Sequence, residues 1–146
     1  MMIKDCGIND LVDILAWRND PLSCSMSIND KKIGTEEHEK WFQESLINPF
    51  KKMYIGENSD GKIGICLFDY DNLDNFSEVS INLNPKMRGK NLSYELLSNC
   101  IKIYIKNNSY KLKATIKKEN LASLKIFKKC EFYPFGGDDN FYYLTK

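Results

Sequence analysis

A strand pattern that runs through a basic loop into an amphipathic helix constrains this chain more than any other feature. The loop from Pro85 to Ser93 carries one arginine and two lysines and leads directly into the helical pattern. The first backbone N–H groups of a helix lack partners within the helix, and the helix dipole is positive at that end. The sequence therefore predicts an anion site in this loop, suited to a phosphorylated ligand.

The strand before the loop, Phe76 to Leu83, alternates in polarity, which is typical of a strand with one buried face. The apolar face consists of Val79, Ile81 and Leu83. The polar face consists of Glu78, Ser80 and Asn82. The helix after the loop, Leu92 to Ile105, has a core stripe at helical spacing, namely Leu96, Leu97, Cys100, Ile101 and Tyr104.

Composition limits the class of protein. The 146 residues, 42% of them hydrophobic, predict a single globular domain spanning residues 1–146. A net charge of +1 argues against a nucleic-acid binder held by bulk charge. No stretch is long and apolar enough for a membrane span, and the start lacks a signal-peptide core, so we expect a cytoplasmic protein.

The five cysteines are odd in number and widely spread, which predicts reduced thiols and no metal site. Arg18 and Arg88 are the only arginines in a lysine-rich chain. An arginine retained against that bias is expected to use its planar fork of donors.

Periodicity and turn residues predict the remaining elements. We expect a helix that Pro21 ends, a polar stretch, and a second helix with Thr35 as N-cap. The other expected elements are strands at Ile3–Cys6, Lys52–Glu57, Lys62–Phe68 and Tyr110–Ile116, a helix at Leu121–Lys129, and a closing hairpin of Glu131–Pro134 and Phe141–Leu144 around Gly136 and Gly137.

Two segments resemble the signatures of the GNAT acetyltransferases. Arg88 to Ser93 resembles their acyl-CoA pyrophosphate loop, Arg/Gln-x-x-Gly-x-Gly/Ala, with Asn91 and Ser93 at the two small positions. Asn tolerates positive φ better than most residues. Asn120 to Phe132 resembles the second signature, with Asn120 as an N-cap and Glu131 in place of the usual glycine.

The resemblance covers essentially the whole chain and implies the GNAT fold. This is an α/β (α+β) fold with a mixed, mostly antiparallel twisted sheet of about seven strands, flanked by about four helices. It also implies acetyl-CoA as cofactor and backbone donors for the oxyanion from Asn82 to Asn84. The residues expected at the cofactor are Leu83, Met87, Arg88, Gly89, Lys90, Asn91, Leu92, Ser93, Asn120, Ser123 and Phe127.

The N-terminal third resembles the nucleotide-amino-sugar N-acetyltransferases of the pseudaminic-acid pathway, in the pairing of Trp17-Arg18-Asn19-Asp20-Pro21 with His38 and Trp41. Arg18, His38 and Ser80 are the expected acceptor-binding residues. The other readings are a buried core histidine and a surface ion pair between Arg18 and Asp20. Glu78 is the candidate general base, acting through water, or else a solvated strand carboxylate.

The general acid stays open. Many family members place a tyrosine where this chain has Phe127, and Tyr133, Tyr142, Tyr143 or solvent could replace it. We expect transfer of an acetyl group to a primary amine of a small molecule, a nucleotide-linked amino deoxysugar. The alternatives are a protein N-terminal acetyltransferase of the ribosomal-protein type and a non-catalytic acyl-CoA-binding module. A homodimer is left open.

Overall fold

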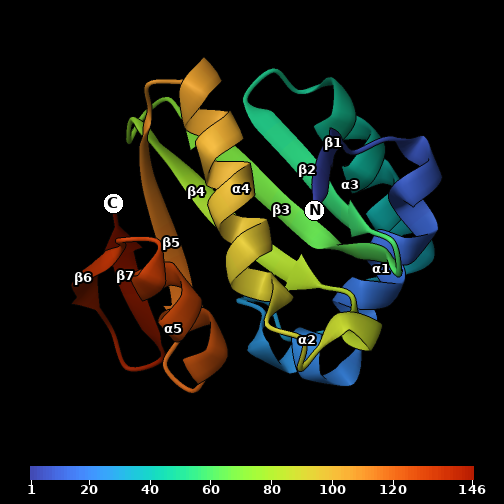
Figure 1. The fold of residues 1–146 in the computed structure, drawn as a ribbon. Coiled ribbons are helices and arrows are strands. Elements are labelled where there is room, and N and C mark those ends of the chain that lie inside the picture. The colour runs from blue at the N-terminus through green and yellow to red at the C-terminus, as the bar shows by residue number, and fades with distance from the viewer.

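A seven-stranded sheet in the order β1-β2-β3-β4-β5-β7-β6 forms the frame of the molecule, and the computed structural model describes all of residues 1–146 (Figure 1). Only β4 and β5 pair in parallel; every other neighbouring pair is antiparallel. The strands are β1 (Met2–Asp5), β2 (Lys51–Asn58), β3 (Gly61–Asp71), β4 (Phe76–Leu83), β5 (Lys111–Lys117), β6 (Tyr133–Gly137) and β7 (Phe141–Thr145). The expected mixed, mostly antiparallel α/β fold is confirmed.

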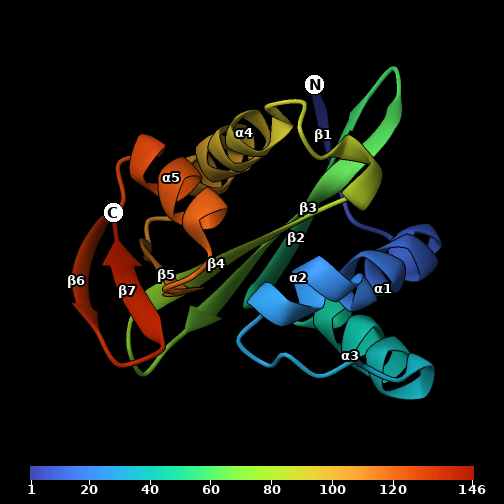
Figure 2. The same cartoon turned by 90° about the horizontal axis from the view of Figure 1, so that it is seen from below.

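Five α-helices cover the sheet, with α1, α2 and α3 on one face and α4 and α5 on the other (Figure 2). They are α1 (Leu11–Asn19), α2 (Pro21–Met26), α3 (Thr35–Ile47), α4 (Leu92–Asn107) and α5 (Leu121–Lys129). None of them has the length and apolar character to cross a membrane.

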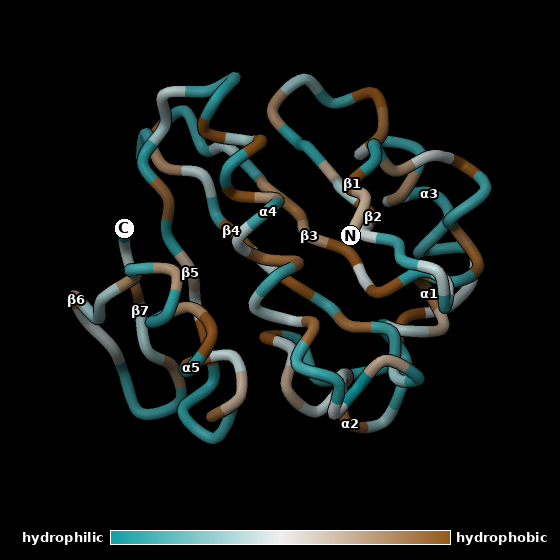
Figure 3. The backbone as a smooth tube through the Cα atoms, in the orientation of Figure 1, coloured by the Kyte–Doolittle hydropathy of each residue, from teal (hydrophilic) through white to brown (hydrophobic).

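Each face of the sheet buries its own apolar cluster. The larger one, of 18 buried residues, lies under α4 and α5 and includes Phe68, Val79 and Leu97. The smaller one, of six residues, lies under α1 and α3 and includes Trp17 and Phe42. Hydrophobic colour follows β3 through the middle of the sheet, between these clusters (Figure 3). The predicted faces of β4 and core stripe of α4 are confirmed.

Two glycines let α4 approach the sheet closely. Gly56 and Gly64 are register partners on β2 and β3. A Cβ on Gly56 would lie 2.5 Å from one Leu96 methyl group, and one on Gly64 would lie 3.0 Å from the other. A side chain at either position would push Leu96 away, so the two glycines form the seat of Leu96 in the first half of α4.

Four sequence expectations need correction. Pro21 does not simply end a helix: it is the first residue of α2, whose N-cap is Asp20, in a stretch expected to be only polar loop. The helix count is therefore five and not about four. The N-cap of α3 is Gly34, and Thr35 is already helical. The last hairpin turns after Gly137, because β6 takes both glycines into its strand.

Glu131 occupies a left-handed backbone position, φ 70°, at the end of α5. There Phe132 N–H donates to the Phe127 carbonyl and Glu131 N–H to the Lys128 carbonyl, each at 3.0 Å. This pair of bonds is the Schellman motif, in which glycine usually takes the left-handed place. The glycine that the family signature has at this position therefore serves the backbone, and a Cβ there costs free energy.

We expect Glu131→Gly to raise the free energy of unfolding by about 0.5–1 kcal/mol, the left-handed penalty less the extra unfolded-state entropy of glycine. The lost ion pair with Lys146, 3.6 Å, matters little because the Glu131 side chain is 86% exposed. Urea unfolding measures the change. Glu131→Ala is the matched control, since it removes the carboxylate and keeps the Cβ. An equal gain in both variants would refute the backbone explanation.

Candidate active site

β4 and β5 part after only three register pairs, the last of which is Glu78 with Lys113. Beyond it β4 continues to Leu83 and β5 continues to Lys117 beside β7, without pairing to each other (Figure 1). The edge of β4 that faces β5 therefore has no ladder partner from Val79 onward. Unpaired strand groups of this kind can bond a ligand that lies along the edge.

The loop after β4 brings this edge to the start of α4. Asn84 stiffens the turn, since its side chain accepts from Lys86 N–H at 3.1 Å and donates to the Lys62 carbonyl at 2.8 Å. Gly89 and Asn91 both have positive φ, 76° and 57°. The expectation that Asn91 fills a left-handed glycine position is confirmed.

No side chain caps α4, so its first amides are left for another acceptor. The start of α5 differs in this respect. There the Asn120 side chain accepts from Ser123 N–H at 3.2 Å, as expected of an N-cap. Both helices begin where β4 and β5 have parted (Figure 1). Of the two helix starts, only the one after the basic loop has first-turn amides that no side chain caps, as the expected anion site requires.

Among the residues expected at the cofactor, Met87 and Phe127 are 4% and 2% exposed. The Phe127 ring packs edge-on against Phe132, with centroids 5.0 Å apart. Burial leaves no side-chain surface at Phe127 for a ligand, so Phe127 is not among the residues that can contact the cofactor in this structure. The Met87 side chain is also buried, and only the Met87 backbone could contact a ligand.

The Arg88 guanidinium is already paired. It donates to the Asp20 carboxylate and, at 2.9 Å, to Ser23 Oγ. This bond lowers the pKa of Asp20. The sequence does not predict either partner, because they lie 68 and 65 positions from Arg88, and Asp20-Pro21 is interpreted there as a helix stop. The same dipeptide is an N-cap followed by proline at the first helical position, a start signal that would have revealed α2.

The polar face of β4 points to the side of the sheet that α1, α2 and α3 cover, since Asn82 is the register partner of Ile65, a member of the smaller apolar cluster. Ser80 is exposed, and Glu78 and Asn82 are half-buried. Burial raises the pKa of the Glu78 carboxyl, against the lowering effects of Thr115 and Lys113. A carboxylate with a raised pKa in a partly open position is suited to accept a proton.

Arg18 and His38 lie near enough for the Arg18 charge to act on the imidazole, as expected, but both side chains already have partners within the protein. The Arg18 guanidinium donates to Cys24 Sγ at 3.3 Å, to the Asn29 carbonyl, and to the Lys31 carbonyl at 3.4 Å. His38 is 2% exposed beside the Trp41 and Phe42 rings. In this structure neither group presents the expected contact to an acceptor. The alternative of a core histidine is the one observed, and Asp20 pairs with Arg88 instead of Arg18.

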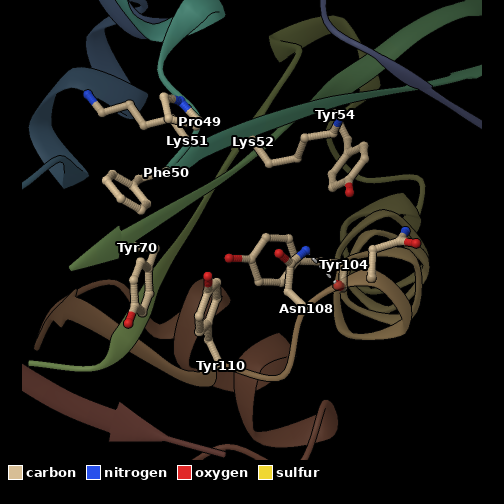
Figure 4. A pocket seen from close by; sticks show the side chains of 10 residues that line it. Pro49, Phe50, Lys51, Lys52, Tyr54, Tyr70, Tyr104, Asn108 and Tyr110 are labelled. Carbon is tan, nitrogen blue, oxygen red and sulfur yellow. Dashed lines mark hydrogen bonds between the residues drawn. The ribbon is translucent and has the colours of Figure 1, made fainter. Parts of the chain in front are cut away.

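Two cavities flank the sheet. One of about 240 Å³ lies at the end where β4 and β5 begin, opposite the anion loop, and is lined by Tyr54, Tyr70, Tyr104 and Tyr110 among others (Figure 4). Tyr70 and Tyr110 stack there with centroids 3.7 Å apart. The other, of about 570 Å³, lies between α1 and the turn after β4. Its acids are neutralised, because Asp13 bonds Lys62 at 2.8 Å and Asp20 bonds Arg88.

No group of three or more His, Cys, Asp or Glu side chains is arranged to hold a metal ion. The five cysteines are unpaired, and four of them are buried. The expectation of mostly buried free thiols is confirmed.

The burial of His38 can be tested by the pH dependence of stability. Burial and the Arg18 charge lower its pKa from 6.5, so the folded state resists a proton that the unfolded state accepts. Stability should therefore be full above pH 6.5 and fall as the pH drops below it towards the folded-state pKa. The slope can reach ~1.4 kcal/mol per pH unit for one proton.

Urea unfolding between pH 7.5 and 5.5 measures this slope. His38 is the only histidine, so His38→Leu should flatten the profile over that range. Equal slopes in the variant and the parent would mean that His38 is accessible to protons in the folded state.

Comparison with known proteins agrees with this geometry. A family model described as the acetyltransferase (GNAT) domain matches residues 3–133. Over 133 residues the chain is 26% identical to the acetyltransferase PseH of Campylobacter jejuni. The matched region covers 90% of this chain and 82% of that protein.

Solved structures share the fold. The spermidine N-acetyltransferase of Vibrio cholerae in complex with CoA and spermine superposes with a TM-score of 0.85 at 14% identity, over 99% of this chain and 94% of that one. A structure assigned to a phosphinothricin N-acetyltransferase superposes at 0.83 with 22% identity, over 99% and 96%. At these identities the likeness shows the fold alone. The family model spans most of the chain, and so this protein belongs to the GNAT acetyltransferase family and is an acetyltransferase.

Proposed function

We propose that this enzyme transfers the acetyl group of acetyl-CoA to a primary amine on a nucleotide-linked amino sugar. The acceptor class rests on the resemblance of the N-terminal third to the pseudaminic-acid pathway enzymes, and the 26% identity to PseH over 90% of the chain supports it. The pairing of Arg18 with His38 supports the same class only as a resemblance in sequence, because in the structure both side chains are engaged within the protein. The five unpaired cysteines fit a reducing compartment, which supports a cytoplasmic enzyme.

The chain's residues fit the cofactor. The uncapped amides of Leu92 and Ser93 would receive the pyrophosphate, with Gly89, Lys90 and Asn91 shaping the approach. The unpaired edge of β4 at Leu83 would bond the pantetheine arm, and Asn120 and Ser123 would line its other side. When bound, this cofactor supplies an acetyl group already activated as a thioester.

The residues of the polar face would handle the amine. Glu78 would take its proton through a water. Of the backbone donors expected from Asn82 to Asn84, the Asn84 N–H already donates to the Ile63 carbonyl at 2.8 Å. The Leu83 N–H, on the unpaired edge of β4, would therefore stabilise the negative charge that develops on the acetyl oxygen. Of the tyrosines in the last hairpin, Tyr143 donates to Asp138 at 2.7 Å, which raises its pKa, and Tyr142 packs against the core. Tyr133, which is exposed, and solvent are then the candidates to protonate the thiolate.

The spermidine enzyme among the structural neighbours suggests a polyamine as the rival acceptor. A polyamine site needs carboxylates free to meet several ammonium groups. In the cavity of about 570 Å³, Asp13 and Asp20 already have cationic partners. The structure therefore gives a polyamine less support than a sugar nucleotide. A protein N-terminus and acyl-CoA binding without turnover are the remaining rivals.

A thiol-release assay with acetyl-CoA tests the acceptor class. The panel should hold nucleotide-linked amino sugars, free amino sugars, spermidine and peptides with free N-termini. We expect turnover with a nucleotide-linked amino sugar at the highest kcat/KM. Turnover of peptides or spermidine alone would replace the sugar proposal, and binding of acetyl-CoA with no turnover on any acceptor would favour a binding module.

Asn120 tests the cofactor site. Asn120→Ala should raise the KM for acetyl-CoA and also cost ~1 kcal/mol of stability through the lost cap. Asn120→Asp is the matched control, because aspartate caps as well as asparagine does but lacks the amide N–H. It should keep the stability and still raise the KM. Unchanged cofactor affinity in both variants would leave Asn120 with only its structural role.

Glu78 tests the base. Glu78→Gln should lower kcat and flatten the alkaline-rising limb of the pH–rate profile, because the amide cannot accept the proton. Since burial raises the pKa of Glu78, that limb in the parent should lie above the range of an ordinary carboxyl group. A variant with the parent's kcat and profile would show that Glu78 only fills its place in the sheet.

A further inference from the structure

Two cationic side chains, one from each side of the place where β4 and β5 part, bond to helix α2. From the loop after β4, Arg88 bonds Asp20 and Ser23 at the start of α2. From the end of β5, Lys117 Nζ donates to the Ser25 carbonyl at 2.8 Å and lies 3.6 Å from Asp30. The two cations thus reach this segment from the two sides of the parting, where β4 and β5 are no longer paired. In Figure 2, α2 lies on the face of the sheet opposite α4 and α5.

The segment that contains α2 is held together internally. Arg18 donates to the Asn29 and Lys31 carbonyls, and the Asn19 side chain bonds both the N–H and the carbonyl of Ile33, at 2.9 and 2.8 Å. These bonds close residues 20–33 into one loop based on α1. Outside α1, the side-chain bonds of this loop to the rest of the protein come from Arg88 and Lys117.

The tie through Arg88 is exchangeable. The Arg88 and Asp20 side chains are 34% and 20% exposed, so water screens the pair and its net contribution is modest. Arg88 is also the arginine of the anion loop, next to the uncapped start of α4. A bound pyrophosphate and the Asp20 carboxylate would then compete for the same guanidinium.

We propose that Asp20 is a positioning residue that couples the cofactor loop to the acceptor side. In the free protein it holds Arg88 and ties the start of α2 to the loop after β4, beside the acceptor side of the sheet. When the pyrophosphate takes Arg88, the loop 20–33 is released on that side and the acceptor gains access. Acetyl-CoA would then bind first and the acceptor second. This inference rests on the proposed cofactor site but on no particular acceptor.

The substitution Asp20→Asn removes the negative charge that holds Arg88 and keeps the N-cap of α2. The Asp20 side chain also accepts from Ser23 N–H at 3.2 Å, and asparagine caps a helix as well as aspartate does. Because Asp20 competes with the ligand, its neutralisation should tighten acetyl-CoA binding by about 2- to 5-fold, the factor expected for a screened ion pair. Isothermal titration calorimetry with acetyl-CoA and no acceptor measures this.

Asp13→Asn is the matched control. It changes the net charge equally on the neighbouring helix α1 but removes a partner of Lys62, not of Arg88. It should leave the affinity for acetyl-CoA unchanged. Unchanged or weaker binding in Asp20→Asn, or equal tightening in both variants, would overturn the proposal.

Hydrogen exchange of residues 20–33 supplies the second readout. In the parent, acetyl-CoA should speed exchange in this loop; in Asp20→Asn the loop should already exchange faster and respond no further. A parent loop that exchanges equally with and without acetyl-CoA would also overturn the coupling.

Neither experiment uses an acceptor, so failure of the sugar proposal would leave both results intact. If the protein does not bind acetyl-CoA at all, the proposed function itself fails, which the same calorimetry shows. Once an acceptor is known, the parent should follow an ordered kinetic scheme with acetyl-CoA first, and Asp20→Asn should change it to a random one. A random scheme in the parent would overturn the predicted order.

Discussion

The parting of β4 and β5 is the constraint on which the rest of the site depends. Two parallel strands that stayed paired would satisfy their own backbone groups and leave nothing for a ligand. Here the ladder stops at Glu78 and Lys113, and α4 and α5 both begin on the open side. The glycine pair Gly56–Gly64 receives the Leu96 side chain, so packing against the sheet holds the first half of α4, whose start has no side-chain cap.

Both arginines of this lysine-rich chain are used where a planar fork matters. Arg88 reaches an acid and a hydroxyl, and Arg18 reaches a thiol and two carbonyls. A lysine could supply the charge in either place but not the fixed directions of several donors. The expectation from composition, that each arginine uses its planar fork, is thus confirmed. The partners of the two arginines differ from those expected, because both organise the segment around α2 instead of lying open to a ligand.

Local signals predicted the elements whose local geometry decides them. Alternation set the faces of β4, Asn120 caps α5, and Asn91 takes a left-handed position because asparagine tolerates it. Helix α2 was missed because Asp20-Pro21 reads both as a stop and as a start, and six residues carry too little periodicity to decide.

The pairing of Arg88 with Asp20 joins residues 68 positions apart, which no local pattern encodes. The same holds for the burial of His38, which depends on how α3 packs. Acetyl transfer from an activated thioester asks little covalent chemistry of the protein, and Phe127 cannot serve as the acid that a tyrosine would be. Catalysis then depends on holding two substrates in line. In such an enzyme the contact that decides when the second substrate may enter matters as much as the base, and Asp20 is placed to be that contact.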